Sequence, residues 1–230
     1  MIDPWSVPQR NLLMSSSQRG RGYARAQLPH APYPVQALAV DRDQAERVLE
    51  RLQVTARSVL GALALESGGL LIDHAWLRIL GGGSEGLPDL AAANELGEVS
   101  EFASPPGLLI VGWDVLGGRF AIDGGVLGLD PGQVCYFVPD TLAWESLGVG
   151  HSAFVSNMIG GAATHFYEGA RWPGWEEDCA ALQLDHGFSL WPPPFSAEGK
   201  DAATVSRRPV PMVELFRFYD DAGQQLSRRR

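Results

Sequence analysis

The sequence predicts an α+β domain built around an antiparallel β-meander. Three short apolar segments between residues 108 and 138 are separated by the turn dipeptides Gly117-Gly118 and Asp123-Gly124. These dipeptides tolerate the positive φ angles of tight hairpins, so consecutive segments are expected to pair as antiparallel neighbours. A sheet this small needs a cover on one face, and amphipathic segments before and after it in the chain can supply that cover.

Length and composition are those of one globular domain. The chain has 230 residues, of which 45% are hydrophobic, and this is enough for a substantial core. Residues 1–37 contain five prolines and no sustained periodicity, which predicts an extended or disordered leader. We therefore expect a single domain over residues 38–222, followed by a basic tail over residues 223–230.

A long helix is predicted over about residues 41–66. Apolar residues recur there at intervals of three and four, Asp41 is a suitable N-cap, and Gly68-Gly69 supplies the stop. A helix of this length would lie across the sheet as its cover. The apolar runs that follow predict one or two strands at about residues 70–80.

The second half of the chain is predicted to be helical and rich in aromatic residues. The meander strands are expected at 108–113, 119–122 and 134–138, after which Asp140 is a candidate N-cap for a segment that docks on the sheet edge. Further helices are expected beyond it, including one from Met212 to Tyr219. Five side chains around the meander should be largely buried: Trp113, Phe120, Ile122, Tyr136 and Trp144.

The net charge of −9 is unevenly distributed. Residues 41–205 contain 8 Lys and Arg against 23 Asp and Glu, so the folded part is strongly acidic. Binding to nucleic-acid phosphates requires clustered cations, which argues against a nucleic-acid surface on the folded part. The acidic charge is compatible with a basic protein partner. No apolar window approaches the length of a membrane span, and we expect a cytoplasmic protein whose oligomeric state the sequence leaves open.

No known catalytic or metal-binding motif is complete in this chain, and we expect neither a metal nor a cofactor. The glycines at 81–86 satisfy GxGxxG, but Pro88 and a weak helix pattern follow, so a simple loop is the better interpretation. Asp73 and His74 could form a base with its orienting carboxylate, but adjacent residues of a strand point to opposite faces.

An enzyme site remains an alternative. Its candidates are two carboxylates near turns and two histidines, although acids at such positions are more often turn formers. The four residues are Asp114, Asp123, His151 and His165.

Aromatic side chains are concentrated between residues 166 and 195. The simpler interpretation is that they close one end of the core, because aromatic side chains are large units of burial. The alternative is a groove that receives a peptide or a base, with Arg171 and Glu168 as polar anchors. In a module that binds a basic protein, the acidic residues would steer the encounter and Trp172 or Trp175 would hold the complex. The candidate binding residues are Glu168, Arg171, Trp172, Trp175, Glu176, Glu177 and Asp178.

Two motifs, YFVPDTLAWESLG from Tyr136 and FYEGARWPGWE from Phe166, carry a family resemblance. Through them, residues 38–220 resemble a bacterial family described only as a domain of unknown function. The layout of glycine turn and hairpins over residues 70–160 is similar to the SUKH superfamily, whose members are α+β domains. Many SUKH members are immunity proteins that bind and neutralise bacterial toxins, and no catalytic residues come with the resemblance.

The expected function is therefore that of a non-catalytic protein-binding module, of the immunity type that neutralises a basic toxin. The alternative is a small-molecule-binding protein, or an enzyme of unknown reaction, with a pocket near the central sheet. Salt-sensitive association without turnover would indicate the first function. A pocket whose side chains titrate abnormally would indicate the second.

Overall fold

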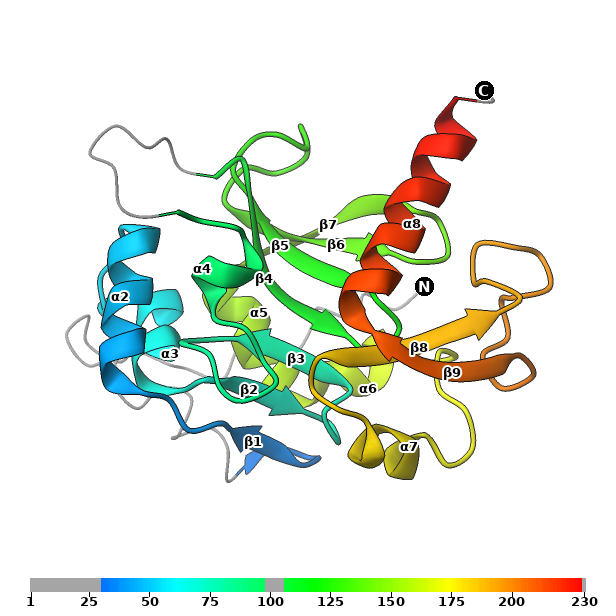
Figure 1. Cartoon of the computed structure of the whole chain (residues 1–230), viewed down its shortest axis with the longest axis horizontal. Helices are drawn as coiled ribbons and strands as arrows, with labels where there is room; N and C mark the ends of the chain where they lie inside the picture. Colours follow the sequence, from blue (N-terminus) through cyan, green and yellow to red (C-terminus); the bar gives the residue numbers. More distant parts are fainter. Residues whose placement is uncertain (1–29, 98–105, 229–230) are drawn as a thin grey trace.

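The computed structural model describes residues 30–97 and 106–228, which form a seven-stranded antiparallel sheet with helices packed around it (Figure 1). Each strand pairs with its neighbours in the sequence, in the order β1-β2-β3-β4-β5-β6-β7. A separate two-stranded antiparallel sheet is formed by β8 and β9. The predicted combination of helices with an antiparallel meander is confirmed, and the meander is longer than predicted.

The strands are short and the helices are of modest length. The strands are β1 (Val35–Ala37), β2 (Gly69–Ile72), β3 (Leu77–Leu80), β4 (Leu108–Asp114), β5 (Arg119–Asp123), β6 (Gln133–Val138), β7 (Ala143–Gly150), β8 (His186–Trp191) and β9 (Ser206–Pro211). The helices are α2 (Arg42–Leu52), α3 (Val59–Glu66), α4 (Leu90–Ala93), α5 (His151–Asn157), the π-helical turn η2 (Met158–Ala162), α6 (Ala163–Phe166), α7 (Trp175–Ala181) and α8 (Met212–Ser227).

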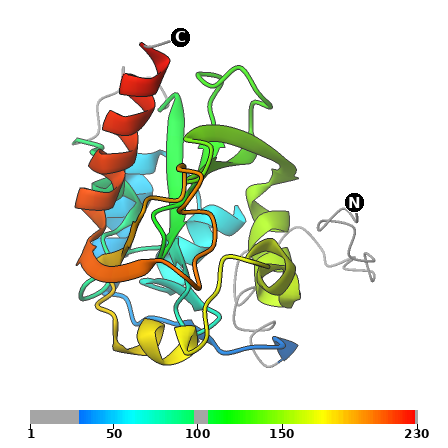
Figure 2. The ribbon, with the colours of Figure 1, turned by 90° about the vertical axis from the view of Figure 1, so that its right-hand side faces the viewer.

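Helices cover the central strands from two sides, as the view in Figure 2 shows. On one face α8 packs with Phe216 against Trp113 of β4, the ring centroids being 5.7 Å apart. On the other face, Phe120 of β5 contacts Phe154 of α5 and Phe166 of α6, at 4.8 and 5.6 Å. Successive residues of a strand point to opposite faces, so β6 contributes to both aromatic layers, with Tyr136 against Phe166 and Phe137 near Tyr219 of α8.

The prediction of one helix over residues 41–66 is wrong, because α2 and α3 are separated by residues 53–58. Gln53 adopts a left-handed conformation with a φ of 54° and ends α2. Ser58 then starts α3 as its N-cap and accepts a hydrogen bond from the Gly61 N–H at 3.0 Å. The apolar spacing continues across the break, so periodicity did not reveal it. The central strands are covered instead by α8 and by α5 with α6.

The prediction of a helical C-terminal half is wrong in part. The segment after Asp140 is strand β7, which pairs with β6 so that Glu145 faces Tyr136 and Trp144 faces Phe137. Both β8 and β9 also lie in this half. The C-terminal helix is confirmed as α8, and the half as a whole mixes strands with helices.

The domain includes residues that the sequence assigned to its flanks. β1, at Val35–Ala37, pairs with β2. Just before it, the Tyr33 hydroxyl donates a hydrogen bond to the carbonyl of Met158. At the other end α8 continues to Ser227, past the predicted end of the domain. The remainder of the predicted leader, residues 1–29, lies outside the described residues.

Burial follows the prediction for some residues of the meander. Trp113 and Phe120 are buried, whereas Ile122, Tyr136 and Trp144 are half-buried. Both cysteines are buried and unpaired. Within the described parts of the chain, no helix is long and apolar enough to span a membrane.

Candidate functional site

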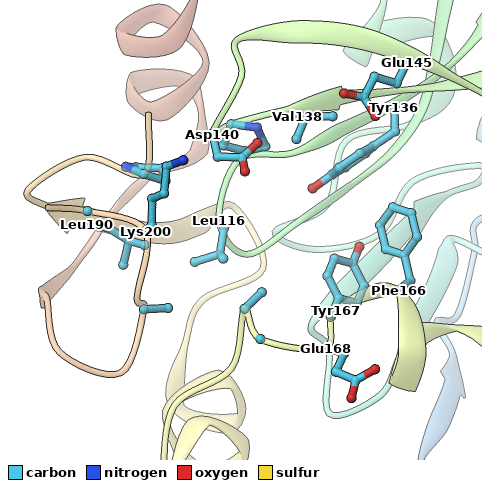
Figure 3. Close-up of a pocket in the computed structure, with 16 residues that line it drawn as sticks. Leu116, Tyr136, Val138, Asp140, Glu145, Phe166, Tyr167, Glu168, Leu190 and Lys200 are labelled. Atoms are coloured by element: carbon cyan, nitrogen blue, oxygen red, sulfur yellow. The ribbon is translucent and has the colours of Figure 1, made fainter. Parts of the chain in front are cut away.

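A pocket of about 410 Å³ opens at one end of the central strands (Figure 3). It lies between the ends of β4 and β6, the segment after α6, and the connection from β8 to β9. Leucine, valine, proline and phenylalanine side chains form the apolar part of its wall. Its polar lining consists of Tyr136, Asp140, Glu145, Tyr167, Glu168 and Lys200.

Asp114 lies behind Tyr136, fully buried at the end of β4. Its Oδ1 accepts the backbone N–H groups of Leu116 at 2.9 Å and Gly118 at 3.0 Å, which closes the turn to β5. Its Oδ2 accepts the Tyr136 hydroxyl at 2.7 Å. Gly118 must lack a side chain, because a Cβ there would collide with the Tyr136 hydroxyl and with Oδ2 of Asp114.

The environment of Asp114 favours its neutral form. Burial raises the pKa of Asp114 to about 6, against the lowering effect of its hydrogen bonds from Tyr136, Gly118 and Leu116. A carboxyl group with this pKa gains and loses its proton near neutral pH. Asp114 itself does not line the pocket, so its protonation can reach a ligand through Tyr136, which does.

Tyr136 and Tyr167 place two hydroxyls on the same side of the pocket, as Figure 3 shows. Tyr136 packs edge-on against Phe166, with 5.0 Å between ring centroids. Tyr167 is 3% exposed, and its hydroxyl lies beside the Asp114 carboxyl without a hydrogen bond of good geometry to any described residue. Burial, and then the charge of the nearby Asp114, raise the pKa of Tyr167. The pocket wall thus places two tyrosine hydroxyls beside one buried carboxyl.

Four charged side chains, here called the rim residues, surround the opening: Asp140, Glu145, Glu168 and Lys200. All four are exposed. In the part of the chain that the structure describes, Lys200 forms no ion pair with any of the three carboxylates. The charges of the rim residues are therefore available to a ligand.

The four residues considered for an enzyme site do not come together. Asp114 adjoins the pocket, but Asp123 lies opposite Leu108 in the register of β4 and β5. The two aspartates are therefore separated by the length of β4, about 20 Å. His151 begins α5 and is buried, while His165 is exposed on α6.

The aromatic and basic candidates for a partner surface have structural partners. Trp172 is buried and donates its Nε1–H to Asp178 at 2.7 Å. Arg171 forms an ion pair with Asp73 and lies over the ring of Trp175, 4.2 Å from its centroid. Trp172 is consequently not at the surface, where an anchor for a partner would have to be.

The acidic candidates are exposed. Glu168 is one of the rim residues. Glu176, Glu177 and Asp178 form the first turn of α7. Negative charge is favourable at a helix N-terminus, so this turn has a structural reason for its composition as well as a possible role at the surface.

Asp73 and His74 lie in the turn between β2 and β3, not on a strand. Asp73, His74 and Ala75 have φ angles of 54°, 57° and 62°, which is left-handed backbone. In this turn the two side chains meet, with His74 Nδ1 3.2 Å from Asp73 Oδ1. The prediction that they point to opposite faces is wrong because it assumed a strand. The ion pair with Arg171 ties the turn to the segment after Tyr167.

The glycine-rich loop at 81–86 packs against the protein itself. A Cβ at Gly81 would collide with the carbonyl of Ser67, and a Cβ at Gly82 with that of Ala64. These glycines allow the chain to pass close to the connection between α3 and β2. They have this structural explanation without a bound phosphate.

Sequence reasoning did not select Tyr136, Tyr167 or Lys200 as site residues. Tyr136 and Tyr167 each lie in one of the two motifs that carry the family resemblance, and this was an available signal. Lys200 is the single lysine of the chain, which was a second signal. Within the described residues, no three His, Cys, Asp or Glu side chains are grouped as a metal site requires.

Comparisons with known proteins place the chain in a family. The family described as "Protein of unknown function DUF2625" matches residues 12–215. The chain is 42% identical over 190 residues to the putative uncharacterized protein YbfG of Escherichia coli (strain K12), an alignment that covers 82% of this chain and 85% of that protein. It is 37% identical over 153 residues to an uncharacterized protein of Haemophilus influenzae, covering 66% and 67% of the two chains. No solved structure matches. The chain therefore belongs to the DUF2625 family.

Proposed function

We propose that the protein binds a small organic molecule in the pocket between β4, β6 and the segment after α6. The observation that carries this proposal is the pocket of about 410 Å³ whose wall includes Tyr136, hydrogen-bonded to the buried Asp114, and Tyr167, whose hydroxyl lies beside the same carboxyl. Ligand sites are concavities of about 300–1,000 Å³ that combine an apolar wall with a few polar groups.

The surroundings of Asp114 support the same proposal. A buried carboxyl whose pKa is shifted beside a cavity is typical of functional sites. Here the hydroxyl of Tyr136 connects the carboxyl to the pocket wall. A ligand that hydrogen-bonds to Tyr136 would therefore respond to the protonation of Asp114.

The test is a fragment screen by saturation-transfer difference NMR with the wild type and two matched variants. Ala170→Trp places an indole in the pocket wall, whereas Ala180→Trp adds the same side chain at an exposed position of α7. We expect a set of fragments to bind the wild type and Ala180→Trp but not Ala170→Trp. Should Ala170→Trp fail to fold, Pro194→Trp blocks the same pocket from the β8 to β9 connection. Equal binding to the wild type and to a folded, blocked variant would overturn the proposal.

A second candidate function is that of a SUKH-like protein-binding module that neutralises a basic toxin. The observation that favours it is the exposed acidic turn of α7, formed by Glu176, Glu177 and Asp178. Asp185, shortly after it, is also exposed. Clustered carboxylates speed and orient the encounter with a basic partner.

The second candidate is tested by capture from the source cell. Glu176→Lys with Glu177→Lys reverses the charge of the α7 turn, and Asp43→Lys with Glu50→Lys makes the same change on exposed positions of α2. We expect a basic protein to be captured by the wild type and by the α2 control, and to be lost from the α7 variant. Capture by all three forms would exclude the α7 turn as the contact. Trp172→Ala is unsuitable here, because Trp172 is buried and its loss would open the core.

A further inference from the structure

The side chains that line the pocket indicate the chemical class of its ligand. We infer that it takes an organic cation, an ammonium group attached to a flat aromatic or apolar body. This inference rests on the proposed function, since it names the ligand class of the same pocket. Its three supports are the charge of the rim residues, the aromatic wall, and the pairing of Arg171 with Asp73.

The rim residues carry an excess of negative charge. Asp140 follows β6, Glu145 lies on β7 and Glu168 follows α6, so carboxylates approach the opening from three elements. Among the described residues, Lys200 is the single cation that lines the pocket. In Figure 3, Lys200 and Asp140 lie on one side of the opening and Glu168 on the other. A ligand ammonium can therefore meet Glu168 or Glu145 without lying next to Lys200.

The wall behind the rim is aromatic. Tyr136, Phe166 and Tyr167 line the pocket on the side away from Lys200. Aromatic faces attract cations through their quadrupole and pack well against flat apolar groups. The combination of such faces with nearby carboxylates is what an amine with an aromatic body requires. A carboxylate ligand would meet repulsion from three sides and attraction from one.

Arg171 does not neutralise this site. Its guanidinium carbon lies 5.9 Å from the ring centroid of Tyr167, close enough to matter for the pocket. However, Arg171 is already paired with the buried carboxylate of Asp73. The charge of Arg171 is thereby compensated, and the pocket keeps the excess of negative charge at its rim.

The polar groups of the pocket wall indicate which chemical group the ligand carries at the end opposite its ammonium. Tyr136 donates its hydroxyl to Asp114, and the Tyr167 hydroxyl lies beside the same carboxyl. A phenol or another neutral hydrogen-bonding group can accept from, or donate to, these hydroxyls. A suitable probe is therefore tyramine, which joins a phenol ring to an ammonium group and is small enough for about 410 Å³.

The test compares tyramine with two analogues that keep its phenol ring. In 4-ethylphenol the ammonium group is absent, and in 3-(4-hydroxyphenyl)propanoate a carboxylate replaces it. We expect tyramine to bind the wild type at least about fivefold more tightly than either analogue in calorimetry at pH 7 and low salt, because several carboxylates act on one cation. Binding of tyramine should weaken as salt screens the rim charges.

Variants of the rim residues should change the affinity for tyramine in opposite directions, according to the charge that each removes. Glu168→Gln removes a negative charge and should weaken tyramine binding about two- to fivefold, whereas Lys200→Gln removes the opposing positive charge and should strengthen it by a similar factor. Asp130→Asn, an exposed carboxylate outside the pocket, is the matched control and should leave binding unchanged. Damage to the fold would weaken binding in both rim variants, so opposite changes identify a charge effect.

Failure of this inference can be told apart from failure of the proposed function. If 4-ethylphenol or the propanoate binds the wild type as tightly as tyramine and loses binding in Ala170→Trp, the pocket binds small molecules and the cation class is wrong. If none of the three probes binds, the class is also overturned, and the fragment screen alone decides whether the pocket binds other molecules. Should all three bind Ala170→Trp as well as the wild type, their binding lies elsewhere and both proposals lose this support.

Discussion

Asp114 and Asp123 end two adjacent strands, yet the structure uses them differently. Each Oδ1 accepts backbone N–H groups of the turn that follows, from Leu116 and Gly118 for Asp114 and from Gly125 and Leu127 for Asp123. The second oxygen of Asp114 accepts a tyrosine hydroxyl. The second oxygen of Asp123 is buried without a hydrogen-bond partner in the part of the chain described here. Each aspartate therefore uses Oδ1 to close its turn and leaves Oδ2 for other contacts. The side chains around Oδ2 decide whether a site forms.

The two ends of the central strands also differ in what covers them. At the Asp114 end, Tyr219 of α8 donates to the carbonyl of Leu116 at 3.1 Å, and a pocket adjoins the turn. At the Asp123 end the following loop is open, with Val126 67% exposed. His151 begins α5 there, and burial lowers its pKa to about 4. Burial thus favours the neutral form of one group at each end: the protonated carboxyl of Asp114 and the deprotonated imidazole of His151.

The largest expected effect is the difference between removing the two aspartates. Asp114→Ala leaves two N–H groups and the Tyr136 hydroxyl without their partner inside the core, and we expect it to cost about 3 kcal/mol of unfolding free energy. Asp123→Ala frees N–H groups of an open loop, which can turn to water, and should cost about 1 kcal/mol. Urea unfolding at pH 5 measures both, and equal costs would contradict the contrast between the two ends.

The next effect is on the pH dependence of stability, where the two ends oppose each other. The pKa of Asp114 is raised to about 6 in the folded protein, above an unfolded value of about 3.9. Its contribution to stability is therefore present below about pH 4 and is lost as pH rises through 6. The pKa of His151 is lowered to about 4 from about 6.5, so its contribution is present above about pH 6.5 and is lost as pH falls through 4.

Variants at each end should expose these opposing contributions. Between pH 4.5 and 7, we expect the stability of Asp114→Asn relative to the wild type to rise by about 2 kcal/mol, and that of His151→Leu to fall by about 2 kcal/mol. Taking each difference at the same pH removes the contributions of the other carboxylates. Differences that do not change with pH in either variant would show that the two groups do not titrate as proposed.

The smallest effect concerns the attachment of α8 to the Asp114 end. Asp220 of α8 pairs with Arg119 of β5 through two hydrogen bonds, and Arg119 also lies over the rings of Phe137 and Phe216. Asp220 is about half exposed, so we expect Asp220→Asn to cost less than about 1 kcal/mol. The cost should shrink further in high salt. A cost above that of Asp123→Ala would mean that α8 depends on this pair more than on its aromatic contacts.

The central strands could be predicted from the sequence because their turns carry a local signal. Gly117-Gly118 lies in the short connection from β4 to β5, whereas Asp123-Gly124 begins a longer loop, residues 124–132, instead of a tight hairpin. The three strands are where they were expected. The break between α2 and α3 could not be found in the same way, because the apolar spacing continues across it. Ser58 is the N-cap of α3, but a serine inside a continuous apolar pattern does not by itself indicate that a helix begins there.

The candidate site was predictable only in part. Asp114 was selected as a carboxylate near a turn, but the same criterion selected Asp123, which lies at the other end of the strand. The feature that distinguishes them is the approach of Tyr136, Tyr167 and the pocket to Asp114 alone. These residues come from separate elements, and their meeting follows from the register of the sheet and the path of the chain after α5. No local pattern contains that information.

Lys200 offers a single amine side chain at the pocket that can be modified selectively. Because it is the single lysine of the chain, a reagent that acylates amines can modify one side chain, besides the α-amino group, without any mutation. Lys200 is exposed at the opening of the pocket, so a bound ligand that shields it would slow its acylation. The native protein can thus report the occupancy of its own pocket by mass spectrometry. A fluorophore attached at the same amine would serve as a reporter for screening ligands.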